Sequence, residues 1–432
     1  MGLFDWLKAF LGGAPSSTTP DPAERTLAHA AKQLGVDRRN RAPQLNKLRY
    51  RPTLVRTPLK QTLAGRDRPY PGANRDPRTG AWLDLTTDSD QRWLDYYGLP
   101  RLKTPQDLAD WLQLPLGKLA WLTCRWKPDF RPESTTRAHY HFHWVEKRSG
   151  GLRLIEAPKP QLKAVQLRIL RDILDNVPIH QQAHGFCVGR SVLTNAQPHV
   201  GQRIVLKFDL ENFYPNVRYN RVVAIFRSLG FSRDVAIWLG RLTTSALPRD
   251  ADRNLDHPRD LTLLNYNNRH LPQGAPTSPA LANLSAYALD VRLSGLARKF
   301  NARYTRYADD LTFSGNRQFA GALADFIPLV RQIIHSERFR TNRTKGRVLR
   351  SSQRQTVTGV VVNSKPNFRR DEFDRLKAIL HNCVRRGPRS QNRDHHERFA
   401  EHLRGRIAYV TQLNPARGAK LLALYQQINW SR

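Results

Sequence analysis

Two strand-like segments that lie far apart in the chain both run into aspartates. The first, residues 203–210, is rich in β-branched and apolar residues and stops at Asp209. The second, residues 303–315, alternates apolar and polar side chains on both sides of Asp309 and Asp310, which predicts a β-hairpin with an acidic tip. A fold that contains these strands must therefore place carboxylates at the ends of buried segments.

Carboxylate oxygens at two chain-distant points are the ligands that Mg²⁺ prefers in proteins. Two such ions a few ångströms apart can activate an attacking hydroxyl and neutralise a leaving pyrophosphate. The alternative is that strand-end aspartates only form turns, since a Tyr-x-Asp-Asp sequence also occurs by chance in long chains. The pattern alone leaves both interpretations open.

Positive charge dominates the composition. The chain has 71 Lys and Arg against 36 Asp and Glu, a formal net charge of +35, and most of the basic residues are Arg. Guanidinium groups bind phosphates in a bidentate way and stack on bases. We therefore predict a nucleic acid partner with salt-dependent affinity, because a merely solvated basic surface does not need so large an imbalance.

Neither a membrane span nor a disulfide framework is predicted. No apolar run approaches the roughly 20 residues that cross a bilayer, which argues against integral membrane association. The three cysteines, Cys124, Cys187 and Cys383, are far apart in the sequence, so they predict neither a Cys-only zinc site nor a set of disulfides. A reducing, cytoplasmic location suits them.

Composition and periodicity divide the chain into three regions. Residues 1–120 are predicted to be an accessory extension that includes a Pro- and Arg-rich stretch of little periodicity. A helix is predicted over residues 104–114, with Thr104 as its N-cap. Residues 121–362 mix strands and helices, with one long helix predicted over residues 278–300. Residues 363–432 are predicted to be helical and are basic.

Three sequence blocks, in this order, resemble the central palm motifs of reverse transcriptases. They are FDLENFYPN (208–216), LPQGAPTSP (271–279) and RYADD (306–310). Residues 149–166 are similar to the fingers segment of these enzymes, and NRTKG (342–346) is similar to their later palm lysine motif.

Two further elements resemble those of the retron reverse transcriptases in particular. NAQPH (195–199) is similar to their Asn-Ala-x-x-His element, and QTVTGVVVN (355–363) to the Val-Thr-Gly element that introduces the thumb. The resemblance implies an α+β right-hand polymerase fold. Fingers and palm would lie in 121–362 and a helical, basic thumb in 363–432, with a mostly helical or irregular N-terminal extension.

The resemblance also implies roles in the chemistry. Asp209 and Asp309 would bind two Mg²⁺ ions, with Asp310 close by and the carbonyl of Leu210 completing the coordination. Lys345 would be a proton donor to pyrophosphate. The run of Arg around Lys345 makes a plain phosphate-binding surface an equal alternative.

A second group of residues matches the family's nucleotide-binding positions. Tyr214 resembles the steric gate that excludes a ribose 2′-hydroxyl, the alternative being a core aromatic. Gln273 and Gly274 lie in a predicted loop, where Gln donates and accepts hydrogen bonds and Gly permits close backbone approach. Arg153, helped by Lys147, would bind the triphosphate from a fingers hairpin.

RNA contacts are predicted in the two retron elements and in the thumb. The alternatives are that the His element braces the palm, that the Val-Thr-Gly element only sets a turn, and that the thumb helix is merely solvated. The predicted RNA-binding residues are Asn195, His199, Thr358, Gly359, Arg404 and Arg406.

The implied function is that of an RNA-directed DNA polymerase. Its partners would be dNTPs, a structured non-coding RNA that serves as template and primer, and the short branched, RNA-linked DNA product, with anti-phage defence and a partner effector as the family's usual role. A group II intron-type reverse transcriptase is disfavoured by the two retron elements. A catalytically silent RNA-binding scaffold is disfavoured because it has no need to hold carboxylates together at electrostatic cost.

Overall fold

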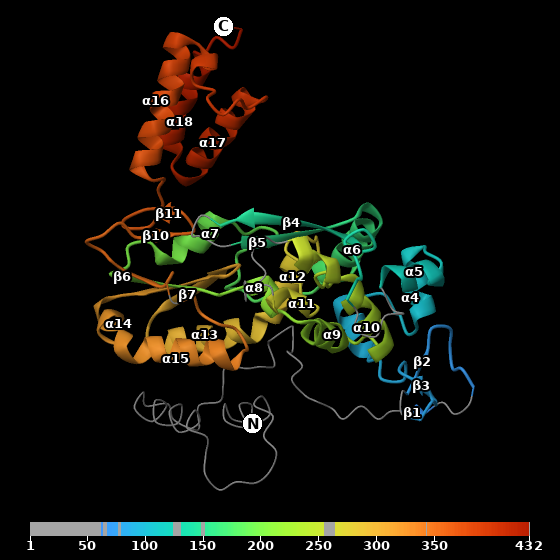
Figure 1. Cartoon of the computed structure of the whole chain (residues 1–432). Coiled ribbons are helices and arrows are strands. Elements are labelled where there is room, and N and C mark those ends of the chain that lie inside the picture. Colours follow the sequence, from blue (N-terminus) through green and yellow to red (C-terminus); the bar gives the residue numbers. More distant parts are fainter. Residues whose placement is uncertain are drawn as a thin grey trace. The chain divides into compact units, whose positions relative to one another are not determined.

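The computed structural model describes residues 62–63, 67–76, 79–123, 131–147, 152–254, 264–342 and 344–431 (Figure 1). These residues form a mixture of helices and antiparallel strands, in agreement with the predicted α+β class. Their contacts define two compact units, each assembled from separate parts of the chain. Unit 1 comprises the described residues of 1–180, 212–291 and 334–340, and unit 2 those of 181–211, 292–333 and 341–432.

A four-stranded antiparallel sheet with the order β7-β8-β6-β9 is the centre of unit 2. Both strand predictions are confirmed, because the segment that ends at Asp209 is an inner strand and the acidic-tipped segment is a hairpin. The strand register places Asp209 directly opposite Asp310. The strands are β6 (Ile204–Asp209), β7 (Arg303–Tyr307), β8 (Asp310–Gly315) and β9 (Arg347–Arg350).

An aromatic cluster supports the hairpin from one side. Phe313 of β8 stacks on Tyr304 of β7 with ring centroids 4.8 Å apart. It also meets Phe326 of α15 (Leu323–Ser336) edge-on at 5.0 Å. Because Phe313 and Phe326 are fully buried, this packing holds the hairpin in place by burial of large aromatic surfaces.

The prediction of a single helix over residues 278–300 is wrong in one respect. The structure has two helices there, α12 (Ser278–Ser285) and α13 (Tyr287–Lys299), separated at Ala286. The Arg221 guanidinium donates to the Ser285 carbonyl at 2.6 Å, at the place where α12 ends. This is a tertiary contact that helical periodicity cannot indicate.

Three short helices form much of the described extension in unit 1: α3 (Gln91–Tyr97), α4 (Pro105–Leu112) and α5 (Leu116–Leu122). The predicted N-cap of α4 is confirmed, since Thr104 and Asp107 form a reciprocal capping box. A small sheet of order β1-β3-β2 precedes these helices. Its strands are β1 (Thr62–Leu63), β2 (Asn74–Arg75) and β3 (Trp82–Asp84).

A buried aspartate anchors the extension to the rest of unit 1. Asp234, in α10 (Arg233–Leu242), accepts hydrogen bonds from the Tyr70 hydroxyl at 2.7 Å and from the Trp238 indole at 3.2 Å. Burial and the neighbouring Asp234 carboxylate raise the pKa of Tyr70. The Asp90 amide also donates to the carbonyl of Gly230, just after α9 (Tyr219–Ser228). The described part of the extension thus belongs to the same compact unit as α9 and α10.

A β-hairpin in unit 1 corresponds to the predicted fingers segment. Strands β4 (Tyr140–Glu146) and β5 (Leu152–Pro158) pair in antiparallel register and are followed by α6 (Pro160–Asp172). Leu154 and Glu156 of β5 point inward and are completely buried, whereas Arg153 between them is exposed. This alternation is what a strand with one buried face requires.

The C-terminal part of unit 2 is helical, as predicted, and has its own core (Figure 1, red). Apolar side chains recur at helical spacing on all three helices and face one another, while most of the Arg side chains of the first helix are exposed. The helices are α16 (Arg370–Arg386), α17 (Phe399–Leu413) and α18 (Pro415–Gln426).

None of the helices in the described ranges is long and apolar enough to cross a membrane.

We predict that Tyr70→Phe lowers the free energy of unfolding by about 2 kcal/mol, because buried Asp234 loses its closest hydrogen-bond donor. Urea titration measures the change. Tyr96→Phe is the matched control, since Tyr96 is 58% exposed and should change stability by less than about 0.5 kcal/mol. Equal effects of the two substitutions would contradict the anchoring role of Asp234.

Candidate active site

Three aspartates meet at one end of the sheet in unit 2. Asp209 is the last residue of β6 and lies opposite Asp310, the first residue of β8. Asp309 occupies the turn between β7 and β8, and its carbonyl accepts a hydrogen bond from the Leu210 amide at 2.9 Å. The structure therefore brings together the four residues that the sequence analysis assigned to metal binding.

The turn that carries Asp309 is tightly held. Ala308, the first turn residue, has φ +54°, a conformation that costs a residue with a Cβ roughly 1–2 kcal/mol. The fully buried Arg306 donates to the Ala308 carbonyl at 3.0 Å. Gly185 lies so close that a Cβ there would sit 2.6 Å from the Ala308 amide nitrogen. The position of Asp309 is thus set from several directions.

The pKa values of Asp309 and Asp310 are raised, mainly because both carboxyl groups are buried. Burial, followed by the charges of Asp209 and Asp310, raises the pKa of Asp309 to about 6. Burial also raises the pKa of Asp310, an effect that nearby Lys207 opposes. Negative charge at this end of the sheet is therefore incompletely compensated by the protein itself.

Lys345 lies on this cluster. Its ammonium group donates to both carboxylate oxygens of Asp209, each at 3.1 Å. The preceding segment is fixed by the Asn342 amide, which donates to the Asp209 carbonyl at 2.8 Å. The Asn342 side chain also accepts hydrogen bonds from the amide and hydroxyl of Thr344, a turn that presents the next residue.

The donor set suits a hard divalent cation, because it consists of carboxylates whose charges are undercompensated. A cationic group already lies on Asp209, namely the Lys345 ammonium. Among the described residues, no three His, Cys, Asp or Glu side chains are arranged as a ready-made metal site. The carboxylates fit Mg²⁺ in their chemistry, and a bound ion would compete with Lys345 for Asp209.

The His element braces the sheet. His199 is completely buried, and its ring nitrogens lie 2.6 Å from the Ser314 hydroxyl and 2.8 Å from the Thr305 hydroxyl. Burial lowers the pKa of His199 to about 3, so the ring is neutral at physiological pH. The prediction that His199 contacts RNA is therefore corrected in favour of the alternative, since the side chain has no surface to offer.

The two retron elements contact each other although they are far apart in sequence. The Asn195 side-chain amide donates to the Thr358 hydroxyl at 3.3 Å, and Asn195 is 1% exposed. Its predicted RNA contact is thus also replaced by a structural role. Thr358 and Gly359 form the two-residue turn between β10 (Thr356–Val357) and β11 (Val360–Val361), with φ +46° and +84°. Two positive φ values identify a type I′ turn.

The predicted nucleotide-binding residues all lie in unit 1. Arg153 is exposed on β5, and Lys147 follows β4 and is half-buried. Gln273 and Gly274 lie in the predicted loop just before α12, and Gly274 has φ +127°. Tyr214 belongs to the single-turn helix α8 (Phe213–Asn216) and is partly exposed.

The neighbour of Tyr214 has a different role. Phe213 is buried and packs against Phe339 with ring centroids 5.8 Å apart. It is therefore a core aromatic, whereas Tyr214 keeps part of its ring accessible. The two neighbouring aromatic residues therefore differ in burial, and Tyr214 is the more accessible of the two.

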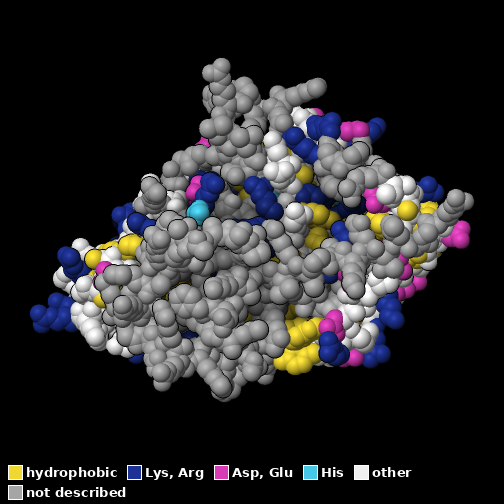
Figure 2. Space-filling view, turned by 90° about the horizontal axis from the view of Figure 1, so that it is seen from below, with side chains coloured by type: hydrophobic (Ala, Val, Ile, Leu, Met, Phe, Trp, Pro, Cys, Tyr) yellow, Lys and Arg dark blue, Asp and Glu magenta, His cyan; other side chains and the backbone are white. Residues whose placement is uncertain are grey.

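The predicted RNA-binding arginines of α17 differ in exposure. Arg404 is exposed, while Arg406 is half-buried, and burial together with nearby Arg375 lowers the pKa of Arg406. Lys and Arg side chains also lie at several separate places on the described surface shown in Figure 2.

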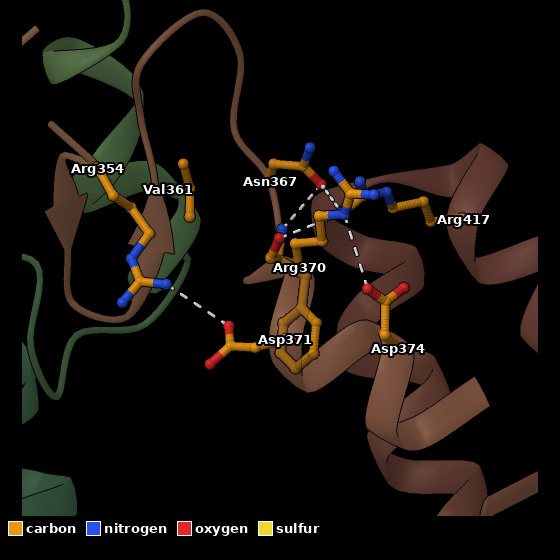
Figure 3. A pocket seen from close by; sticks show the side chains of 8 residues that line it. Arg354, Val361, Asn367, Arg370, Asp371, Asp374 and Arg417 are labelled. Carbon is orange, nitrogen blue, oxygen red and sulfur yellow. Dashed lines mark hydrogen bonds and ion pairs between the residues drawn. The ribbon is translucent and has the colours of Figure 1, made fainter. Parts of the chain in front are cut away.

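A groove of about 460 Å³ lies in unit 2 near the start of α16 (Figure 3). Its charged side chains already pair with neighbours. Arg354 lies 3.5 Å from Asp371, and Arg370 lies 3.7 Å from Asp374. Arg417 donates to Asn367 at 3.2 Å. Because basic and acidic groups alternate along it, the groove does not present a uniform charge to a phosphate backbone.

Two basic residues that interact with the Asp309–Asp310 turn were not predicted from the sequence. Neither Arg306 nor Lys207 was assigned a role, yet Arg306 donates a hydrogen bond to the Ala308 carbonyl and the charge of Lys207 opposes the rise in the pKa of Asp310. A basic residue inside a strand of a buried sheet was the available signal, because such a residue needs a partner.

Comparison with known proteins identifies a common family. A family model described as reverse transcriptase (RNA-dependent DNA polymerase) matches residues 145–362. The chain is 42% identical over 340 residues to Retron Mx65 reverse transcriptase of Myxococcus xanthus, covering 78% of this chain and 74% of that protein. It is 37% identical to Retron Mx162 reverse transcriptase of the same organism, covering 76% and 67%. Identity to Retron Ec86 reverse transcriptase of Escherichia coli is 31%, covering 77% and 91%.

Burial of His199 predicts a pH dependence of stability. The unfolded chain binds a proton at this position below about pH 6.5, whereas the folded chain does so only near pH 3. Stability is therefore lost as the pH falls, by about 2 kcal/mol from this group between pH 8 and pH 5. The free energy of unfolding, measured by urea titration at several pH values in this range, should depend less steeply on pH in His199→Gln than in wild type. His141→Gln, at an exposed position, should keep the wild-type dependence on pH. The same pH dependence in all three proteins would contradict the contribution of His199.

Proposed function

The chain belongs to the retron reverse transcriptases and is an RNA-directed DNA polymerase, and from this membership we propose that it copies a dedicated structured RNA into short single-stranded DNA. The RNA serves as both template and primer, and the product stays joined to it through a 2′-hydroxyl branch. The structured RNA and dNTPs are thus its substrates.

The carboxylate cluster is the observation that carries this proposal. Asp209 and Asp310 face each other across two paired strands, and the adjoining Asp309 has a raised pKa because it is buried and lies near the charges of Asp209 and Asp310. Holding these groups together is unfavourable for folding. Such an arrangement is retained where the charge has a chemical use, which favours an active polymerase over a silent scaffold.

Asp209, Asp309 and the Leu210 carbonyl would hold two Mg²⁺ ions, with Asp310 adding negative charge beside them. When bound, the ions supply activation of the attacking hydroxyl and neutralisation of the leaving pyrophosphate. Lys345 is suited to transfer a proton to the pyrophosphate, because it is an exposed cation that already lies at the cluster. Releasing Lys345 from Asp209 frees it for this role.

Nucleotide recognition falls to residues of unit 1. Arg153 and Lys147 bind the triphosphate, because both are basic residues at or beside the end of the β4–β5 hairpin. Gln273 and Gly274 bind the nucleotide through side-chain and backbone groups. Tyr214 excludes the ribose 2′-hydroxyl with the part of its ring that is not buried.

RNA binding is assigned to the basic helices of unit 2. Arg404 is exposed on α17, beside the apolar stripe formed by Leu403, Ile407 and Val410. Arg406 contributes from a half-buried position. An apolar stripe beside a basic face allows a helix to lie along an RNA stem through phosphate contacts.

The proposal extends to anti-phage defence with a partner effector, on the strength of the family resemblance. The test is the plating efficiency of phage on cells that carry the native locus with the wild-type or an Asp309→Asn gene. Equal plating on both would contradict a role of DNA synthesis in defence.

Asp309→Asn is expected to reduce DNA synthesis by roughly a thousandfold or more, since it removes a charge that acts on the reacting groups. RNA binding should be nearly unchanged. Nucleic acid that co-purifies with the protein from its native locus is treated with RNase, end-labelled and resolved on a denaturing gel. Wild-type protein should yield a discrete short DNA whose mobility changes after RNase or debranching, and Asp309→Asn should yield none.

Asp325→Asn is the matched control for this experiment. It makes the same chemical change at an exposed position on α15 and should preserve the DNA band. Retained synthesis by Asp309→Asn would remove the carboxylate assignment, and bound RNA without DNA in all three proteins would favour a scaffold.

Tyr214→Val is expected to raise the incorporation of rNTPs relative to dNTPs by about tenfold or more, because the smaller side chain admits a 2′-hydroxyl. Single-nucleotide extension with each dNTP and rNTP measures the ratio. Tyr214→Phe keeps the ring and should keep the wild-type selectivity. Unchanged selectivity in Tyr214→Val would show that the gate lies elsewhere.

A further inference from the structure

A buried carboxylate–imidazole pair lies in unit 1, and neither of its residues has been assigned a role above. Glu156 of β5 and His270 are both 0% exposed, and the Glu156 Oε2 atom lies 2.9 Å from His270 Nε2. The other imidazole nitrogen, Nδ1, donates to the Asn268 carbonyl at 2.8 Å, because a carbonyl can only accept. Nε2 and the carboxyl group therefore share one proton, whichever of the two carries it.

Burying this pair away from water raises the free energy of the folded state. Charged or strongly polar groups without water favour folding only when their geometry is good and their remaining atoms are satisfied. Within the described residues, the Glu156 Oε1 atom is buried without a hydrogen-bond partner. Apolar side chains of similar volume would fill the same space at less cost, so a purely structural role does not account for the choice of residues.

The location of the pair indicates what it does. Glu156 contacts the 271–277 loop through its backbone as well, since its amide donates to the Gln273 carbonyl at 2.8 Å. A Cβ on Gly274 would lie 3.1 Å from the Glu156 carbonyl oxygen, so the loop is pressed against β5. His270 is the residue from which this loop departs, and its own backbone is paired with Ser245.

Glu156 is also close to the predicted triphosphate ligand. Arg153 lies three residues earlier on the same strand and on the opposite face. A displacement of β5 relative to the loop would therefore move Arg153 relative to Gln273 and Gly274. The side-chain bond to His270 opposes this displacement, and the edge-on contact of His270 with Tyr266, 5.3 Å between ring centroids, limits rotation of the imidazole.

We propose that Glu156 and His270 are positioning residues that lock the 271–274 loop to β5 and thereby set the affinity of the enzyme for the incoming dNTP. The inference rests on the proposed assignment of Arg153, Gln273 and Gly274 to nucleotide binding. Neither Glu156 nor His270 touches the substrate. Their loss affects dNTP binding far more than the chemical step.

The test is steady-state extension of oligo(dT) on poly(rA) with dTTP by the full-length protein. Glu156→Ala should raise the KM for dTTP about tenfold and change kcat by less than about threefold, because misplaced binding groups weaken substrate binding. Glu156→Gln can still hydrogen-bond to His270 and should keep the KM within about twofold of wild type. A KM for Glu156→Ala that equals the wild-type value would overturn the proposal.

A second variant covers the case in which Glu156→Ala does not fold. The double substitution Glu156→Leu with His270→Phe keeps the buried volume and removes the polar pair, a change that buried ion pairs often tolerate. It should raise the KM as Glu156→Ala does, and amide hydrogen exchange in residues 271–275 should be faster than in wild type. A folded double variant with the wild-type KM and the wild-type rate of hydrogen exchange would also refute the positioning role of the pair.

Two controls separate the possible failures. Tyr70→Phe destabilises unit 1 at the Tyr70–Asp234 hydrogen bond and should leave the KM for dTTP unchanged. If Tyr70→Phe raised the KM as much as Glu156→Ala does, the rise would reflect a general loss of stability. Gln273→Ala tests the nucleotide site directly. If Gln273→Ala raises the KM and the Glu156 variants do not, only the positioning role fails; if Gln273→Ala has no effect, the proposed nucleotide site fails as well.

Discussion

The structure of unit 2 is organised around the repulsion among three carboxylates at one end of its sheet. Asp209 and Asp310 are brought face to face by the strand register, and Asp309 joins them from the adjacent turn. Like charges brought together in this way raise the free energy of the folded state, so the surrounding structure must hold them in place. The buried Arg306, the close approach of Gly185 and the aromatic packing of Phe313 supply this support without neutralising the carboxylates.

The two retron elements belong to the same support. His199 ties β7 to β8 through two hydroxyl groups, behind the strands that end at the aspartates. Asn195, four residues earlier, holds the turn formed by Thr358 and Gly359. The side chains of His199 and Asn195, which were predicted to contact RNA, are thus engaged in hydrogen bonds inside the fold, and that of Asn195 reaches the β10–β11 hairpin.

The excess of positive charge is used in two different ways. Buried or half-buried guanidinium groups, such as those of Arg221 and Arg306, satisfy carbonyl groups inside the fold. Others, such as Arg404, remain exposed. Net charge therefore predicts a nucleic acid partner for the whole chain, but it overstates the number of groups that can contact a phosphate backbone.

The order of motif blocks along the chain indicated the family by resemblance. The local sequence pattern was enough to predict the strand ending at Asp209 and the acidic hairpin, because these depend on alternation and turn chemistry. It was also enough to place a loop at Gln273 and Gly274 and an N-cap at Thr104. What local patterns could not decide were contacts between distant segments. The burial of His199, the pairing of Asn195 with Thr358, the end of α12 beside Arg221 and the Glu156–His270 pair each join residues far apart in the chain. Only the tertiary structure sets such contacts, since periodicity records which face of an element is buried but not which partner it meets there.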